Sequence, residues 1–165
     1  IKAGGVTHKT VCTTDLLATC AAILGQKLME DEGVDSFSML PLFSEETEDA
    51  FKRPFTIHHS INGSFAIRKR DYKFIFCSGS GGWSYPRPGR NEGENLPKFQ
   101  LYNLKDDPAE SNNLYGQLPE IEHELIALFK DAIKNGRSTQ GTVQENYSTF
   151  LSGDKWNPLA MFTAE

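Results

Sequence analysis

The sequence FAIRKRDYKFIF, residues 65–76, is the clearest indication of the fold, because apolar side chains recur in it at every second position. Alternate side chains of a β-strand point to the same face of a sheet, so this alternation is typical of a strand with one face in the core. The charged residues 69–71 separate two such runs, which favours a tight turn between antiparallel strands. The residues expected on the core face are Phe65, Ile67, Tyr72, Phe74 and Phe76.

Two further strands are expected on either side of this hairpin. Residues 55–59 alternate in the same way, and a turn at 60–63 that contains Asn-Gly leads into the hairpin. Asparagine and glycine adopt the positive φ that such turns need. Residues 99–102 form the fourth run, after a loop at 77–97 that is rich in Gly, Pro, Ser and Asn. The pattern predicts an antiparallel sheet of about four strands.

Two helices complete the predicted fold. Pro119 favours a helix start and Gly136 a helix end, and between them an apolar stripe at helical spacing predicts a long amphipathic helix. Residues 14–24 predict a short helix with a strongly apolar face, stopped by Gly25. We therefore expect an α+β fold, in which a roughly four-stranded antiparallel sheet packs against one long C-terminal helix and a shorter N-terminal helix precedes them.

Composition excludes several classes of function. The chain of 165 residues carries a net charge of −5, whereas general nucleic-acid binding needs a dense basic face. No apolar run approaches the roughly 20 residues that a membrane span requires. The three cysteines form no metal-binding pattern, and Cys12 and Cys20 lie in apolar segments where we expect them to be buried. No metal site is predicted.

Two histidines and one loop are the candidates for chemistry. His58 and His59 are adjacent in an expected strand, so their side chains point to opposite faces and cannot share one ligand. Either one ring packs on the core and the other lies at the surface, or one imidazole reaches a cleft and binds an anion or a sugar hydroxyl. The loop from Trp83 to Arg90 includes Arg87. Either its indole and guanidinium groups bind sugars and anions, or Trp83 merely pins the loop to the sheet.

Segments in the first quarter of the chain resemble the sulfatase family. Residues 13–19 (TTDLLAT), followed by Leu24-Gly25, are similar to the family's Ser/Thr-x-Asp-Leu-x-Pro-Thr segment and the Leu-Gly after it, with Ala18 in place of the proline. Residues 35–42 (DSFSMLPL) resemble the family's Asp-Gly-x-Ser-Leu-x-Pro stretch.

Three later segments continue the resemblance in the same order. Residues 65–75 are similar to the Ala-Ile-Arg-x-Gly-x-Trp-Lys-Leu hairpin of sulfatases, with Arg70 and Tyr72 as departures. Residues 101–114 (LYNLKDDPAESNNL) resemble the Leu-Tyr-Asp/Asn-Leu-x-x-Asp-Pro-x-Glu-x-x-Asn-Leu pattern most strongly. Residues 136–139 look like the closing segment of bacterial arylsulfatases. Five segments in register identify the chain as similar to the C-terminal portion of a sulfatase.

The resemblance implies a parent of the alkaline-phosphatase superfamily that hydrolyses sulfuric esters with a formylglycine and a calcium ion. That aldehyde derives from the Cys or Ser of a Cys/Ser-x-Pro/Ala-x-Arg motif. The run that begins at Cys20 lacks the arginine, and Ser84 is followed by an arginine one position early. The sequence therefore offers no catalytic residue, no metal ligand and no cofactor of its own, and we expect the chain to be inactive alone.

The family also suggests an organisation into two parts. Residues 1–50 correspond to a remnant of the large sulfatase domain with its connecting loop, and residues 51–165 to the C-terminal subdomain. Because that subdomain borders the active-site cleft in the family, its exposed ring and guanidinium groups are the candidates for substrate binding. These candidates are His58, His59, Trp83 and Arg87.

The partners implied by the resemblance are the N-terminal sulfatase domain and a sulfated carbohydrate or aryl sulfate substrate. A periplasmic or secreted location follows from the family. The apolar face expected at residues 14–24 predicts that the fragment associates with itself. An alternative is a stand-alone carbohydrate- or protein-binding module derived from a sulfatase.

Overall fold

The structure is a computed structural model, and it describes residues 3–44, 47–87, 95–145 and Phe162. The chain divides into two compact units. Unit 1 comprises Ile1–Thr56 and Ala132–Trp156, and unit 2 comprises Ile57–Asp131 and Asn157–Glu165.

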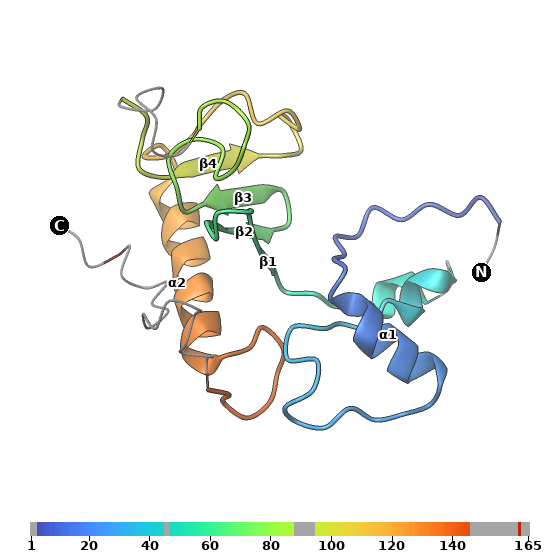
Figure 1. Ribbon diagram of the computed structural model, residues 1–165. Coiled ribbons are helices and arrows are strands. Elements are labelled where there is room, and N and C mark those ends of the chain that lie inside the picture. Colours follow the sequence, from blue (N-terminus) through green and yellow to red (C-terminus); the bar gives the residue numbers. More distant parts are fainter. Residues whose placement is uncertain (1–2, 45–46, 88–94, 146–161, 163–165) are drawn as a thin grey trace. The chain divides into compact units, whose positions relative to one another are not determined.

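A four-stranded antiparallel sheet forms the centre of unit 2, as predicted (Figure 1). Its strands follow the chain in the order β1-β2-β3-β4, a simple meander. In the register of the central pair, Ile67 lies opposite Phe74, and Phe74 lies opposite Leu101 on the next strand. All three side chains are fully buried. The strands are β1 (Thr56–His59), β2 (Phe65–Lys69), β3 (Tyr72–Ile75) and β4 (Gln100–Asn103).

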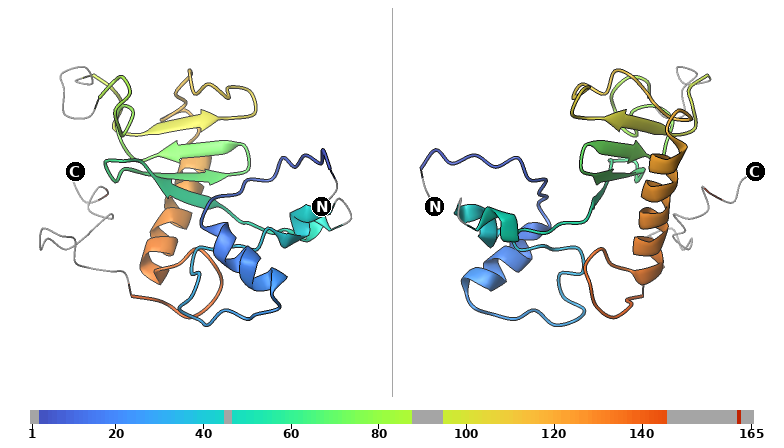
Figure 2. Two further views of the ribbon diagram at one scale, coloured as in Figure 1. Left: turned by 45° about the vertical axis from the view of Figure 1, so that its right-hand side comes forward. Right: turned by 180° about the vertical axis from the view of Figure 1, so that it is seen from behind.

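The long helix α2 (Pro119–Asn135) covers one face of this sheet, which both views in Figure 2 make visible. Phe129 is fully buried, and its ring stacks on that of Phe76 at a centroid distance of 4.2 Å and lies 5.4 Å from that of Phe65. Such distances are typical of aromatic cores. Phe162, far along the chain, adds a further ring 5.6 Å from Phe76, which no periodicity predicted. Among the described residues, neither α2 nor any other helix has the length and apolarity to cross a membrane.

The segment after β4 closes the open edge of the sheet. The amide oxygen of Asn113 accepts hydrogen bonds from the backbone N–H groups of Leu101 (2.9 Å) and Tyr115 (3.0 Å), and its amide nitrogen donates to the carbonyl of Phe99 (3.3 Å). The N–H of Leu114 donates to the carbonyl of Leu101 at 2.8 Å. An edge strand exposes unpaired backbone groups, so Asn113 supplies partners that a neighbouring strand would otherwise provide.

In unit 1 the helix α1 (Asp15–Ile23) buries a largely polar face and exposes an apolar one, the reverse of an ordinary surface helix. It buries Asp15, Thr19 and Ala21. Its apolar side chains face solvent instead, and Cys20, which the sequence predicted to be buried, is exposed as well. Two short 3-10 helices, Leu40–Phe43 and Glu48–Ala50, follow α1. The large apolar residues exposed on or next to α1 are Val11, Leu16, Leu17, Ile23 and Leu24.

A buried ion pair between Asp15 and Arg53 organises unit 1. The two side chains are 0% and 5% exposed. The Asp15 carboxylate also accepts the backbone N–H of Cys12 (2.9 Å) and that of Phe37 (3.1 Å), and the guanidinium lies 4.4 Å from the centroid of the Phe37 ring. A buried carboxylate is tolerated only when it is paired and hydrogen-bonded, and Asp15 meets both conditions. The Thr14 side chain makes no capping bond, and the Asp15 carboxylate binds the backbone at the helix start instead.

Thr19 and Ser36 extend this network to the loop after α1. The Thr19 hydroxyl donates to the carbonyl of Asp15 (2.6 Å) and accepts the N–H of Met39 (2.9 Å). The N–H of Ala18 donates to the hydroxyl of Ser36 at 2.9 Å, a bond that proline at position 18 could not form. The residues of 13–19 that carried the family resemblance are therefore structural in this chain.

A second buried cation, Arg137, holds unit 1 together at the other end. Its guanidinium donates to the carbonyls of Glu30 (3.1 Å) and Thr142 (2.9 Å) and to the hydroxyl of Thr139 (3.0 Å). Three carbonyl or hydroxyl acceptors satisfy the buried donors of one arginine, so segments more than a hundred residues apart in sequence are joined.

Candidate functional site

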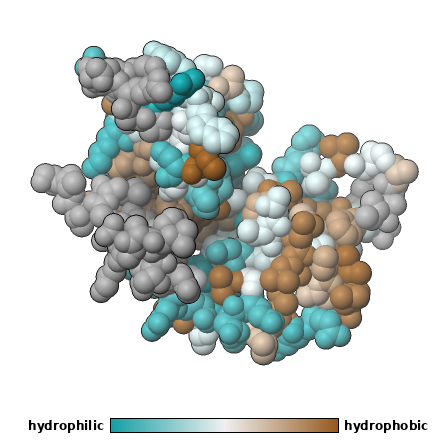
Figure 3. All heavy atoms as spheres, viewed as in Figure 1, coloured by the Kyte–Doolittle hydropathy of each residue, from teal (hydrophilic) through white to brown (hydrophobic). Residues whose placement is uncertain are grey.

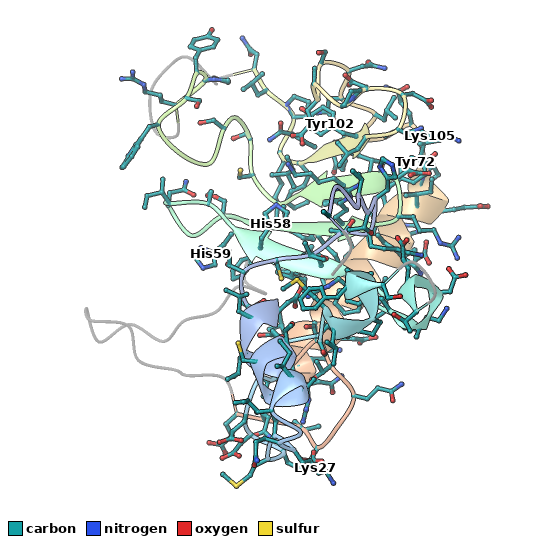
Figure 4. The ribbon with its side chains drawn as sticks, turned by 90° about the vertical axis from the view of Figure 1, so that its right-hand side faces the viewer. Lys27, His58, His59, Tyr72, Tyr102 and Lys105 are labelled. Atoms are coloured by element: carbon teal, nitrogen blue, oxygen red, sulfur yellow. The ribbon has the colours of Figure 1, made fainter. Side chains whose placement is uncertain are left out.

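The two adjacent histidines lie at one end of β1 and project to different sides of the strand (Figure 4). His59 faces the aromatic core side, with its ring in an edge-on contact with Phe65 at 5.9 Å, and its Nδ1 lies 3.0 Å from the carbonyl oxygen of Ser60. His58 takes the opposite face. Both residues are exposed, so neither is a buried core histidine.

The loop at 77–87 is compact and held by its own hydrogen bonds. The Ser80 hydroxyl donates to the carbonyl of Ser84 (2.7 Å), and the Ser80 N–H donates to that of Pro86 (3.0 Å). The side-chain amide of Gln100 on β4 donates to the carbonyls of Cys77 and Gly79, each at 2.8 Å. These bonds fix the base and the neck of the loop to the sheet.

This ordered loop presents two aromatic side chains to solvent. Trp83 is 81% exposed and Tyr85 is 77% exposed, while the Arg87 guanidinium donates from Nε to the carbonyl of Trp83 at 3.1 Å. The interpretation in which the tryptophan pins the loop to the sheet is therefore wrong, because Gln100 does so instead. Arg90, the end of the loop as the sequence defined it, lies outside the described residues.

The loop also lies against the turn that follows the histidines. A Cβ atom placed on Gly81, which has a φ of +64°, would come within 2.8 Å of the Ser60 hydroxyl oxygen, and one on Gly82 within 3.3 Å of Ile61 Cγ2. Glycine is required at Gly81 by both the conformation and the space. The structure thus brings the Trp83 loop next to the His59–Ser60 end of β1.

A polar row crosses the sheet on the face opposite the aromatic core. Arg68 lies directly opposite Lys73, and Lys73 directly opposite Tyr102. The Lys73 ammonium pairs with the carboxylate of Glu110 at 2.6 Å, and the Tyr102 hydroxyl donates to the side-chain oxygen of Gln100 at 2.8 Å. Sequence reasoning did not select this row, although the alternation that put Ile67 and Phe74 in the core also places Arg68 and Lys73 together on the other face.

His58 belongs to the same face as this row. Although the residue is exposed, partial removal of its ring from water lowers the pKa of His58, and the positive charge of Lys73 lowers it further. Glu110 acts in the opposite direction, and His59 and Arg68 add smaller lowering effects. The charges of Lys73, Glu110 and Arg68 therefore all act on the His58 ring. Burial raises the pKa of Tyr102, and the negative charges of Glu110 and Asp107 raise it further. This phenol therefore stays protonated at neutral pH.

The described residues do not fit the cofactors that the family resemblance implies. They contain no group of three or more His, Cys, Asp or Glu side chains placed to hold a metal ion. Residues 64–68 (SFAIR) match the Cys/Ser-x-Pro/Ala-x-Arg pattern, the source of a formylglycine, a match that sequence reasoning missed. Its last four residues belong to strand β2, and no group of metal-holding side chains accompanies it among the described residues. The geometry instead provides ring faces, guanidinium groups and an imidazole, which are groups that bind sugars and anions.

Comparisons with known proteins agree with the resemblance seen in the sequence. No protein-family profile matches the chain. The N-acetylgalactosamine-6-O-sulfatase of Bacteroides thetaiotaomicron is 33% identical over 116 residues, which are 70% of this chain and 22% of that protein. Human arylsulfatase A is 29% identical over 137 residues, 78% of this chain and 27% of its own.

A solved structure from work on glycosaminoglycan metabolism by Bacteroides thetaiotaomicron matches the fold with a TM-score of 0.54 and 30% identity, and the match covers 72% of this chain and 24% of that one. An α+β unit of this kind, matched by sulfatases in both sequence and structure, is related to the sulfuric ester hydrolases. The chain belongs to the sulfatase family, as a C-terminal portion that spans about a quarter of the length of these relatives.

Proposed function

We propose that the chain is the substrate-side part of a sulfatase that acts on a sulfated sugar or an aryl sulfate. The observation that carries the proposal is the ordered loop at 77–87, which displays Trp83 and Tyr85 to solvent beside the histidine end of β1. A loop fixed by Gln100 loses little conformational freedom when a ligand binds, and exposed rings on such a loop are suited to stacking against a sugar.

The roles of the four candidate residues follow from their positions. Trp83 offers a ring face to a pyranose, and Arg87 on the same loop offers planar donors to a sulfate. His59 lies next to the turn that the loop contacts, whereas His58 lies on the polar face of the sheet. The groups that would cleave the ester, a formylglycine and a calcium ion, belong in this proposal to the remainder of the enzyme, so the chain binds substrate without hydrolysing it.

Calorimetric titration with N-acetylgalactosamine 6-sulfate, the sugar that the name of one relative suggests, tests the proposal. We expect Trp83→Ala and Arg87→Gln each to weaken binding about tenfold, because a ring contact or a charge-assisted hydrogen bond contributes on the order of 1–3 kcal/mol. Arg70→Gln is the matched control, since Arg70 is an exposed arginine in the β2–β3 turn. Equal affinities of Arg87→Gln and Arg70→Gln for the sulfated sugar would show that Arg87 of the loop does not contact it.

The exposed apolar side of α1 is the second part of the proposal. Leu16, Leu17, Ile23 and Leu24 are 51–72% exposed, and Figure 3 shows apolar residues gathered over this part of unit 1. A contiguous apolar surface is unusual on a soluble monomer and marks an interface. We propose that residues 1–50 derive from the large sulfatase domain and that this side of α1 packs against the rest of that domain in a full-length enzyme. By analogy with the sulfatase family, we propose that the full-length enzyme is periplasmic or secreted.

Without that covering, the chain is expected to associate with itself through α1. Leu17→Glu should shift the chain toward the monomer in sedimentation velocity and reduce the binding of a hydrophobic dye, because it places a charge on the apolar surface. Ile61→Glu is the control, since Ile61 is equally apolar and 69% exposed but lies in unit 2. A wild-type chain that stays monomeric at high concentration and binds no dye contradicts this interface.

A further inference from the structure

Two local rules of protein structure are broken on the polar face of the sheet. Arg68 and Lys73 stand directly opposite each other on β2 and β3, although like charges in opposed cross-strand positions destabilise a sheet. Glu110, which pairs with Lys73, has a φ of 55°, a left-handed conformation that residues other than glycine and asparagine adopt at a cost. Departures of this kind concentrate at functional sites.

The guanidinium of Arg68 is oriented but not neutralised. Its Nε donates to the carbonyl of Arg70 at 3.1 Å, which fixes the plane of the group. Within the described part of the chain no carboxylate forms an ion pair with Arg68, whereas the buried arginines Arg53 and Arg137 each have one. The two terminal nitrogens of Arg68 are thus left as a planar pair of donors, the geometry that binds an oxyanion through two bonds.

The neighbours of Arg68 fit an oxyanion as well. Lys73 lies opposite it, and His58 lies within electrostatic reach of both cations on the same face. Among the described residues, Glu110 is the carboxylate that acts on His58, and it is already engaged by Lys73. An anion would relieve the repulsion between the two cross-strand cations and favour the protonated form of the imidazole.

We propose that Arg68, Lys73 and His58 form a second oxyanion site, on the sheet face away from the aromatic core, that takes a sulfate or carboxylate group. This site does not use Trp83 or Arg87 of the loop, so it stands apart from the substrate contacts proposed for them. Glu110 tunes the site, because it withdraws part of the charge of Lys73 from an incoming anion.

The test follows the imidazole C–H resonance of His58 by NMR at constant ionic strength while sodium sulfate replaces sodium chloride. Inorganic sulfate is expected to bind saturably and to move the pKa of His58 upward from its lowered value. Arg68→Gln should weaken sulfate at least tenfold, since it removes a bidentate charge-assisted contact. Arg70→Gln, two residues away, should leave the affinity unchanged.

Variants at the ion pair give shifts of opposite sign. Lys73→Met should raise the pKa of His58 and weaken sulfate, and Glu110→Gln should lower that pKa further and strengthen sulfate. The proposal is overturned if Arg68→Gln binds sulfate as tightly as the parent chain. It is also overturned if Lys73→Met and Glu110→Gln lose the same amount of sulfate affinity. Parallel titrations with acetate and with N-acetylgalactosamine 6-sulfate separate a free anion from a sugar substituent. If Arg87→Gln loses sugar binding but still binds inorganic sulfate, the sulfate site at Arg68, Lys73 and His58 is supported and is separate from the sugar contacts of the loop.

Discussion

Replacing Asp15 by asparagine is expected to lower the free energy of unfolding by about 3–5 kcal/mol, the range measured when one partner of a buried ion pair is removed. The substitution leaves the Arg53 guanidinium buried at 5% exposure without its counter-charge. The Nε of Arg53 already has no hydrogen-bond partner among the described residues, and the other partners of the guanidinium, the Thr56 hydroxyl (3.4 Å) and the Cys12 sulfur (3.3 Å), carry no formal charge. An asparagine also offers an N–H group where the carboxylate accepts those of Cys12 and Phe37.

Urea unfolding measures this effect, with Asp49→Asn as the matched control. The Asp49 carboxylate is fully exposed and lies 3.8 Å from the Lys9 ammonium, so its removal should change stability by no more than about 0.5 kcal/mol. The double variant Asp15→Leu with Arg53→Met should recover much of the loss, because apolar residues of similar volume replace both charges. If Asp15→Asn unfolds at the same urea concentration as Asp49→Asn, the buried pair does not organise unit 1.

The second large effect is expected in the aromatic core of unit 2. Phe129→Ala should lower the free energy of unfolding by about 3–5 kcal/mol, the usual result of emptying a phenylalanine site in a packed interior. Phe129 is fully buried, and its ring contacts Phe65, Phe76 and Phe162 at centroid distances of 5.4, 4.2 and 6.2 Å. The removed ring therefore leaves a cavity lined by other rings that cannot all close upon it.

Thermal and urea unfolding followed by near-ultraviolet circular dichroism report this change directly, since the aromatic rings give the signal. Ile61→Ala, at a side chain that is 69% exposed, is the surface comparison and should remain within about 0.5 kcal/mol of the parent chain. A loss of less than 1 kcal/mol in Phe129→Ala would mean that α2 does not pack on the sheet as described.

The sheet and the long helix could be predicted from the sequence because their patterns are local. Alternation placed Ile67 and Phe74 on the core face, and helical spacing placed Leu125 and Phe129 on one stripe of α2. The inversion of α1 could not be predicted, because the burial of Asp15 depends on an arginine 38 positions away. Composition alone assigned Cys20 to the interior, whereas it lies on the exposed side of the helix.

The candidate site could be predicted only in part, for a similar reason. The residue types at Trp83 and Arg87 suggested a sugar- or anion-binding loop, but the side chain that holds the loop, Gln100, carries no signal in the sequence. The ion pair between Lys73 and Glu110 joins two separate segments that each resemble sulfatases, and neither segment alone predicts it. Only the register of β2 and β3 shows that Arg68 lies opposite Lys73.

We propose that this chain binds a sulfated substrate and does not cleave it. The most direct measurement titrates the chain with N-acetylgalactosamine 6-sulfate and with unsulfated N-acetylgalactosamine, in the presence of calcium, and assays sulfate release in the same samples. We expect saturable binding of the sulfated sugar alone and no release of sulfate. Release of sulfate by the chain itself, or equal affinity for the two sugars, would contradict it.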